Sequence, residues 1–251
     1  MAFFGLFGPK PDALPPPEQV EWILVAWRWL EQHLGQQRGL PPGVVVLPTP
    51  DSMPVQLARG HALAMNVSAF VQARAGLEDW HCALEAQAPD HLRDLALRTG
   101  GRHSSKGTAG TFQVGDGQVV ITYDPDQLDD LEGFVALMAH EWSHYLLALV
   151  PASRPGGPEV EEPLTDLCAV YLGFGVFQAN AAFSFSQFQE GLGGGWHSRS
   201  LGYLGQKGSS FALAVAAVAT GASPGTVKRH LSPNPRSWFS EGVRELKRRS
   251  G

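Results

Sequence analysis

Cysteine and charge are both scarce in this chain of 251 residues. Its two cysteines, Cys82 and Cys168, are too few for the disulfide framework on which many small secreted domains depend. We therefore expect both thiols to be reduced, as in a cytoplasmic protein. Charged residues make up 17% of the chain and the net charge is −5, so we expect no nucleic-acid partner. The basic cluster at residues 244–249 is typical of a solvated helix end.

Long apolar segments are also missing. A membrane-spanning helix needs about 20 consecutive apolar residues, so the sequence predicts no membrane span. The apolar residues 1–7 lack the basic flank and the cleavage motif of a signal peptide. Residues 1–17, which end in a proline run, are expected to form a flexible tail.

Hydrophobic residues make up 43% of the chain, which is enough for the core of one large domain over residues 18–251. We expect an N-terminal lobe over 18–150 with a small sheet, followed by a mostly helical lobe over 151–251. The predicted fold class is therefore α+β. The expected strands are 44–47, 77–84 and a hairpin over 111–123 whose turn is Gly115-Asp116-Gly117. The expected helices are 18–34, 164–183, 209–220, 227–231 and 238–249, and residues 57–72 fit either a helix or a strand.

Residues 137–147, with the sequence LMAHEWSHYLL, place three polar residues between apolar flanks. Because a helix turns about 100° per residue, His140 and His144 share one face and can reach the same ion. Zinc accepts such imidazole nitrogens at about 2.0–2.1 Å. Glu141 borders this face, so its carboxylate can take a proton from a water beside the metal without binding the metal itself. The pattern HExxH is typical of zinc metallopeptidases.

A catalytic zinc site needs a third protein ligand and leaves a fourth position open. Glu162 and Asp166 lie four residues apart in EEPLTDLCAVYLGFG and would share a helix face. We expect Glu162 to be the ligand and Asp166 to accept a hydrogen bond from a ligand histidine. Pro163 suits the first turn of a helix and would put Glu162 at its start, so Asp166 is an alternative ligand.

The order HExxH…Glu162-x-x-x-Asp166 resembles the gluzincin branch of the zincin metallopeptidases. The run LTDLCAVYLGFG also resembles a segment beside HExxH in uncharacterised bacterial proteins, and the resemblance covers roughly residues 111–180. It implies a zincin-like fold, one zinc ion per chain, and a peptide or protein substrate. It also implies that Glu141 is the general base, that Glu162 is the third ligand, and that Asp166 orients a ligand histidine.

Residues 184–208 follow the expected ligands and are rich in glycine and aromatic residues. Gluzincins often place a histidine or tyrosine there to stabilise the oxyanion, which makes His197 and Tyr203 candidate catalytic residues. Two other functions are compatible with the same HExxH helix. One is a non-catalytic protein that zinc stabilises. The other is a metal-free helical interaction module whose polar residues form a buried hydrogen-bond network. The sequence does not indicate an oligomeric state.

Overall fold

The computed structural model describes residues 13–53, 58–87, 110–115, 118–181 and 204–251. Most of the tail expected at residues 1–17 therefore lies outside the described residues. Ala13 and Pro15 are buried, and the first helix begins at Pro17. The described end of the tail is thus packed against the rest of the protein.

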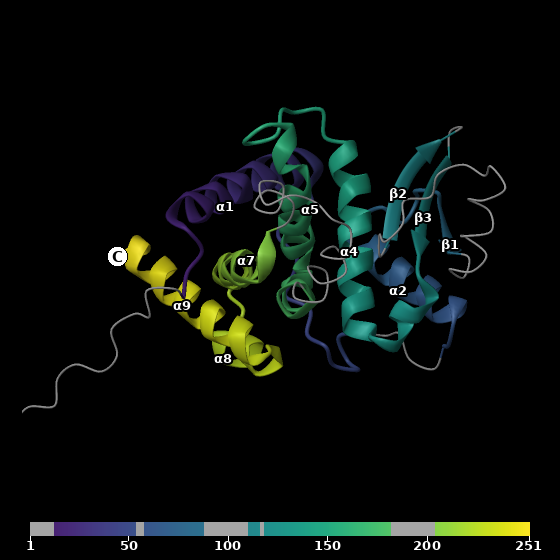
Figure 1. Cartoon of the computed structure of the whole chain (residues 1–251). Coiled ribbons are helices and arrows are strands. Elements are labelled where there is room, and N and C mark those ends of the chain that lie inside the picture. Colours follow the sequence, from purple (N-terminus) through teal and green to yellow (C-terminus); the bar gives the residue numbers. More distant parts are fainter. Residues whose placement is uncertain (1–12, 54–57, 88–109, 116–117, 182–203) are drawn as a thin grey trace, which may run out of the picture.

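Helix α4 (Leu131–Ala148) lies at the centre of the molecule, between a group of helices and a small sheet (Figure 1). It contacts α5 (Glu161–Ala169) on one side, and α2 (His61–Arg74) and strand β2 (Gly110–Gly115) on the other. The side chain of Asp130 caps α4 by accepting the N–H of Gly133 at 3.0 Å. Because neighbours cover α4 on opposite sides, it is apolar around most of its circumference, as expected for a central helix.

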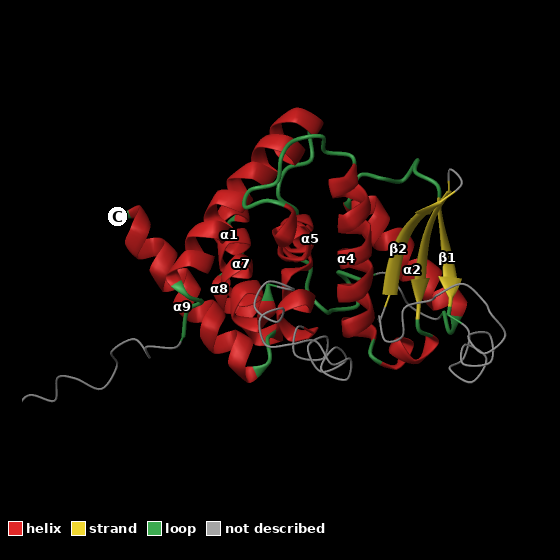
Figure 2. Cartoon of the chain, turned by 45° about the horizontal axis from the view of Figure 1, so that its top comes forward, coloured by secondary structure: helices red, strands yellow, loops and turns green. Residues whose placement is uncertain are grey.

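The remaining helices form a layer on the side of α4 that faces away from the sheet (Figures 1 and 2). Helix α7 packs along α9, and α1 contacts both α5 and α7. The helix expected at residues 18–34 is present, but it runs past Gly35 as a π-helical extension. The bounds of these helices are α1 Pro17–Leu30, α7 Gly205–Thr220, α8 Pro224–Val227 and α9 Pro233–Ser250. The short helical segments are η1 Glu31–Gln36, η2 Pro125–Asp129, η3 Pro158–Val160, η4 Val170–Phe174 and η5 Lys228–His230.

The sheet has three strands in the order β1-β3-β2. The predicted hairpin is confirmed: β2 (Gly110–Gly115) and β3 (Gln118–Tyr123) pair antiparallel, with Val114 opposite Val119. Strand β1 (Cys82–Ala86) pairs parallel to β3. Together with the helices, this small mixed sheet agrees with the predicted α+β class.

The strand predicted at residues 77–84 was placed too early. Residues 77–80 form a turn, in which the side-chain amide of Gln72 donates to the carbonyls of Leu77 and Trp80 at 2.7 and 2.8 Å. In a strand, these carbonyl groups would accept hydrogen bonds from a neighbouring strand. Here the side chain of Gln72 satisfies them instead. The strand therefore begins only at Cys82.

The single helix predicted at 164–183 is broken after α5. It continues as the π-helical η4, in which Gly173 has φ +105°, and residues 175–181 are again helical. The strand predicted at 44–47 is absent, because this segment crosses the break instead. There the N–H groups of Gly43 and Val46 donate to the carbonyls of Tyr171 and Gly173 at 2.7 and 2.9 Å. The extended segment thus satisfies carbonyl groups that the broken helix leaves free.

Two glycines of this broken helix lie close to other segments of the chain. A side chain at Gly173 would meet the carbonyl oxygen of Val44, and one at Gly175 would meet Leu213 of α7. The absence of side chains here permits close approach of the 43–46 segment and of α7.

Replacing Gly173 by alanine is expected to lower the free energy of unfolding by about 3 kcal/mol or more. A non-glycine residue at this φ costs about 1–3 kcal/mol, and the new Cβ would also clash with the carbonyl oxygen of Val44. Gly39→Ala is the matched control, because Gly39 has φ +70° but no atom within 4 Å of the position that the new methyl group would take. The Gly39→Ala substitution should lower the free energy of unfolding by about 1–2 kcal/mol. If urea unfolding shows equal losses of free energy in the two variants, the close approach of the 43–46 segment to Gly173 is contradicted.

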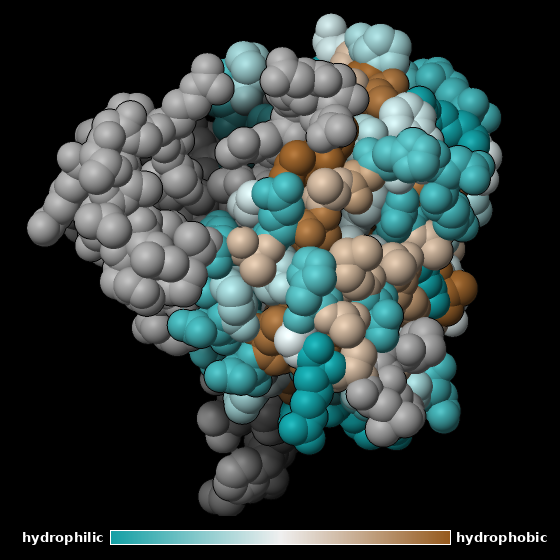
Figure 3. Space-filling model, turned by 90° about the vertical axis from the view of Figure 1, so that its right-hand side faces the viewer, coloured by the Kyte–Doolittle hydropathy of each residue, from teal (hydrophilic) through white to brown (hydrophobic). Residues whose placement is uncertain are grey.

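The surface on the sheet side of the molecule mixes hydrophilic and hydrophobic residues (Figure 3). Met65 of α2 and Trp80 are exposed large side chains, and scattered exposure of this kind is ordinary for a globular protein. Within the described part of the chain, no helix combines the length and the hydropathy that a membrane crossing requires.

Candidate metal centre

Three side chains converge where α4 packs against the first turn of α5. The Nε2 atoms of His140 and His144 lie 3.0 Å apart. The Oε2 atom of Glu162 lies 3.2 Å from Nε2 of His140 and 3.5 Å from Nε2 of His144. One ligand atom from each residue therefore faces a common point, and together they could hold a metal ion.

The spacing of these atoms suits tetrahedral zinc. Ligands at about 2.0–2.1 Å from a tetrahedral ion lie about 3.3–3.4 Å from one another. The three observed separations, 3.0, 3.2 and 3.5 Å, bracket that value. Two imidazoles and one carboxylate also leave one tetrahedral position for a water or a substrate.

Two neighbouring residues determine how the imidazole rings are turned. Nδ1 of His140 lies 2.8 Å from Oδ1 of Asp166, a contact in which the ring nitrogen donates to the carboxylate. Nδ1 of His144 lies 3.3 Å from the hydroxyl oxygen of Thr165. With Nδ1 protonated in each neutral ring, both Nε2 lone pairs are directed toward Glu162. Lone pairs that converge in this way are the arrangement that a cation requires.

The group is open to solvent on the side of Glu162. The side chain of Glu162 is 41% exposed, whereas those of His140 and His144 are 11% and 18% exposed. An ion or a small ligand can therefore approach past the carboxylate, while the helices hold the imidazoles from behind.

The local charges also favour a cation. Burial lowers the pKa of His140, but its hydrogen bonds to Asp166 and Glu162 outweigh burial and raise that pKa to about 10. Burial raises the pKa of Glu162, but hydrogen bonds from the two histidines outweigh it and hold that pKa well below its usual range. Without a metal, the centre thus attracts positive charge in the form of a proton.

Glu141 is buried, with only 5% of its surface exposed, and it does not belong to the three-ligand group. Burial raises the pKa of its carboxyl group, the two histidines lower it, and Glu162 raises it again. Burial raises the pKa of Cys82 on β1 to about 11, and the negative charge of Glu141 adds to that rise. Glu141 is therefore a carboxylate of increased basicity beside the candidate ligands.

Asp166 does not face the common point. One of its oxygens contacts His140, and the other accepts the backbone N–H of Leu204 at 3.0 Å. Glu162 occupies the first turn of α5, as Pro163 suggested, and from there it reaches both imidazoles. The geometry thus favours Glu162 over Asp166 as the third ligand.

Two expected site residues, His197 and Tyr203, lie outside the described residues. Two features of the centre were not anticipated, namely the Thr165 hydroxyl and the Leu204 N–H. A polar residue next to Asp166 in an apolar helix was a weak signal for Thr165. The Leu204 contact involves a backbone group, which leaves no pattern in the sequence.

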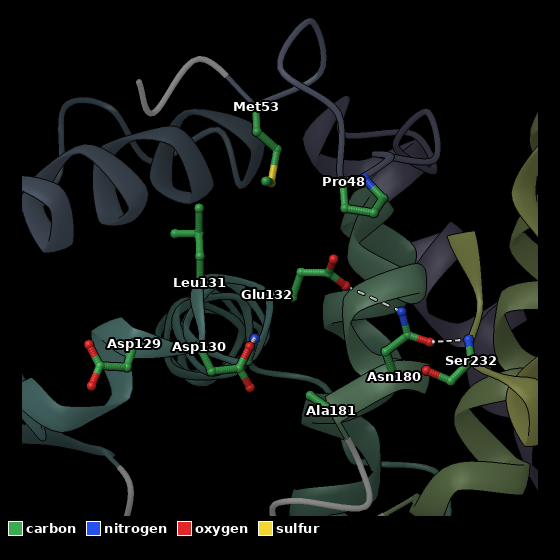
Figure 4. A pocket seen from close by; sticks show the side chains of 10 residues that line it. Pro48, Met53, Asp129, Asp130, Leu131, Glu132, Asn180, Ala181 and Ser232 are labelled. Atoms are coloured by element: carbon green, nitrogen blue, oxygen red, sulfur yellow. Dashed lines mark hydrogen bonds between the residues drawn. The ribbon is translucent and has the colours of Figure 1, made fainter. Parts of the chain in front are cut away.

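A cavity of about 420 Å³ lies at the start of α4 (Figure 4). It is separate from the metal centre, since Glu132 on its wall precedes His140 by about 12 Å of helix. Asn180 on its wall donates to Glu132 at 3.3 Å and accepts the N–H of Ser232 at 3.0 Å. The cavity therefore adds no residue to the metal centre.

Comparison with known protein families, with curated proteins and with solved structures gave no match. The case for a metal centre therefore rests on the residues and their geometry.

Proposed function

We propose that the chain is a zinc-dependent hydrolase that cleaves peptide bonds and has a zincin-like catalytic centre. The observation that carries this proposal is the position of Glu141. Its carboxylate is buried and interacts with the charges of the three candidate ligands, yet Glu141 is not one of them. A zinc centre that only stabilises the fold has no need of such a base.

His140, His144 and Glu162 would hold the ion, with Asp166 fixing the ring of His140. Zinc supplies Lewis acidity there, which polarises a carbonyl group and lowers the pKa of a bound water. Glu141 takes the proton from the attacking water at its carboxylate. It then carries that proton to the nitrogen of the departing amine.

The electrostatics of Glu141 support amide hydrolysis in particular. An amine is a poor leaving group until it is protonated, so the base must also act as an acid in the second step. Because burial raises the pKa of Glu141, its protonated form is more accessible near neutral pH than that of an exposed glutamate. The gluzincin resemblance of the sequence points to the same class of substrate.

The proposal is tested with the purified chain and a mixture of unstructured peptides. We expect hydrolysis that 1,10-phenanthroline abolishes. One equivalent of zinc, added after the chelator is removed, should restore it, because the ligand group suits one zinc ion. Magnesium prefers six oxygen ligands and should not restore activity. Cleavage products are identified by mass spectrometry.

The alternatives give different results in the same experiment. A zinc-stabilised protein without activity would bind zinc and lose thermal stability on chelation, but it would leave the peptides intact. A metal-free interaction module would contain no stoichiometric zinc even after zinc is supplied. Either result would contradict the proposed hydrolase.

A further inference from the structure

We infer that Thr165 is a positioning residue of the metal centre: its hydroxyl holds the ring of His144 as Asp166 holds the ring of His140. The inference rests on the zinc centre of the proposed function, but not on peptide hydrolysis. The HExxH…ExxxD pattern assigns a hydrogen-bonding partner to one ligand histidine only. The partner of the second histidine has to be identified from the structure.

The contacts of Thr165 allow its hydroxyl oxygen to accept a hydrogen bond from the ring of His144. Its side chain is fully buried, and its hydroxyl donates to the carbonyl of Glu161 at 2.9 Å. The same oxygen lies 3.3 Å from Nδ1 of His144. Because the hydroxyl proton is engaged with Glu161, the oxygen offers a lone pair to the ring. This favours the tautomer with a proton on Nδ1 and leaves Nε2 of His144 for the metal.

The helical geometry explains why neighbouring residues can serve both histidines. Glu162 lies three residues before Thr165 and four before Asp166, so all three side chains occupy the same region of α5. Helix α4 presents His140 and His144 one turn apart to this region. A single turn of α5 thus supplies the third ligand and a hydrogen-bonding partner for each ligand histidine.

A simpler explanation is that Thr165 only bonds back to the carbonyl four residues earlier, as buried threonines in helices often do. Thr220 of α7 makes such a bond to Ala216 at 2.8 Å, and it provides a matched control. Changing Thr220 to valine removes a threonine back-bond outside the metal centre. Changing Thr165 to valine removes both the back-bond and the contact with His144.

The experiment compares the zinc affinity of the full chain with those of Thr165→Val, Thr165→Ser and Thr220→Val, by competition with a chromophoric chelator. We expect the dissociation constant for zinc to rise about 10–100-fold in Thr165→Val, the range found when the hydrogen-bonding partner of a ligand is removed. Thr165→Ser should restore most of the affinity, and Thr220→Val should leave it unchanged. An unchanged affinity in Thr165→Val, in a chain that binds zinc, would overturn the inference and leave the proposed function intact.

A second measurement does not depend on any variant folding. In zinc-loaded chain labelled with ¹⁵N, the long-range ¹H–¹⁵N spectrum distinguishes the two nitrogens of each histidine. We expect the proton of His144 on Nδ1 and the metal on Nε2, with the Nδ1 proton protected from exchange by Thr165. Metal on Nδ1 of His144 would overturn the inference. Absence of zinc from the unaltered chain would overturn both the inference and the proposed function.

Discussion

Zinc content is expected to fall from about one ion per chain to almost none when His140 is replaced by alanine. The variant would keep only one imidazole and one carboxylate at the common point, and structural and catalytic zinc sites use at least three protein ligands. The measurement is inductively coupled plasma mass spectrometry of the purified chain after dialysis. His81→Ala is the control, because His81 is exposed and does not belong to the ligand group, so its zinc content should stay at one.

The same measurement separates Glu162 from Asp166. Glu162→Ala removes a ligand atom 3.2 Å from Nε2 of His140, so its zinc should be lost as in His140→Ala. Asp166→Ala removes only the hydrogen bond behind the ring, so zinc should remain at saturating concentration with an affinity about 10–100-fold weaker. Zinc kept in Glu162→Ala and lost in Asp166→Ala would contradict the ligand assignment.

Peptide hydrolysis by Glu141→Gln is expected to be about 10²–10⁴-fold slower than that of the unaltered chain, with zinc content unchanged. Glutamine matches glutamate in shape but cannot take a proton from water or return one to the amine. Because burial disfavours the charged carboxylate at this position, the substitution should not reduce stability through loss of that charge. The measurements are kcat on a defined peptide, zinc content and the thermal unfolding midpoint.

The matched control is Glu159→Gln, which changes an exposed glutamate in the short helical segment η3 before α5. We expect its kcat and zinc content to equal those of the unaltered chain. If Glu141→Gln also retains full activity, Glu141 is not the base and the proposed mechanism fails. A loss of zinc in Glu141→Gln would instead place this residue among the ligands.

The part of the metal centre that lies within one helix could be predicted from the sequence. His140 and His144 belong to one helix, so their relative position follows from the helical repeat alone. The choice between Glu162 and Asp166 needed the packing of α5 against α4, which decides whether a carboxylate lies in front of the imidazoles or behind them. The role of Thr165 depends on the same packing, since a threonine hydroxyl in a helix can bond to its own backbone instead.

The fold shows the same division between local and distant interactions. The hairpin of β2 and β3 was predicted because its turn and its alternating residues are adjacent in the chain. The break in the helix after α5 could not be predicted from its own residues. It depends on the 43–46 segment, whose backbone N–H groups bond to the carbonyls of Tyr171 and Gly173. Helical periodicity within one segment contains no information about such a partner.

The crossing at the helix break also has a consequence for the rate of folding. The Tyr171 hydroxyl bonds to the carbonyl of Leu40, a residue 131 positions away, whereas His140 and Asp166 are only 26 positions apart. Closing the longer loop costs more chain entropy, and contacts between distant residues slow folding. The ligand-bearing helices α4 and α5 can therefore meet before the 43–46 segment is in place. Assembly of the metal ligands is therefore not expected to set the folding time of the chain.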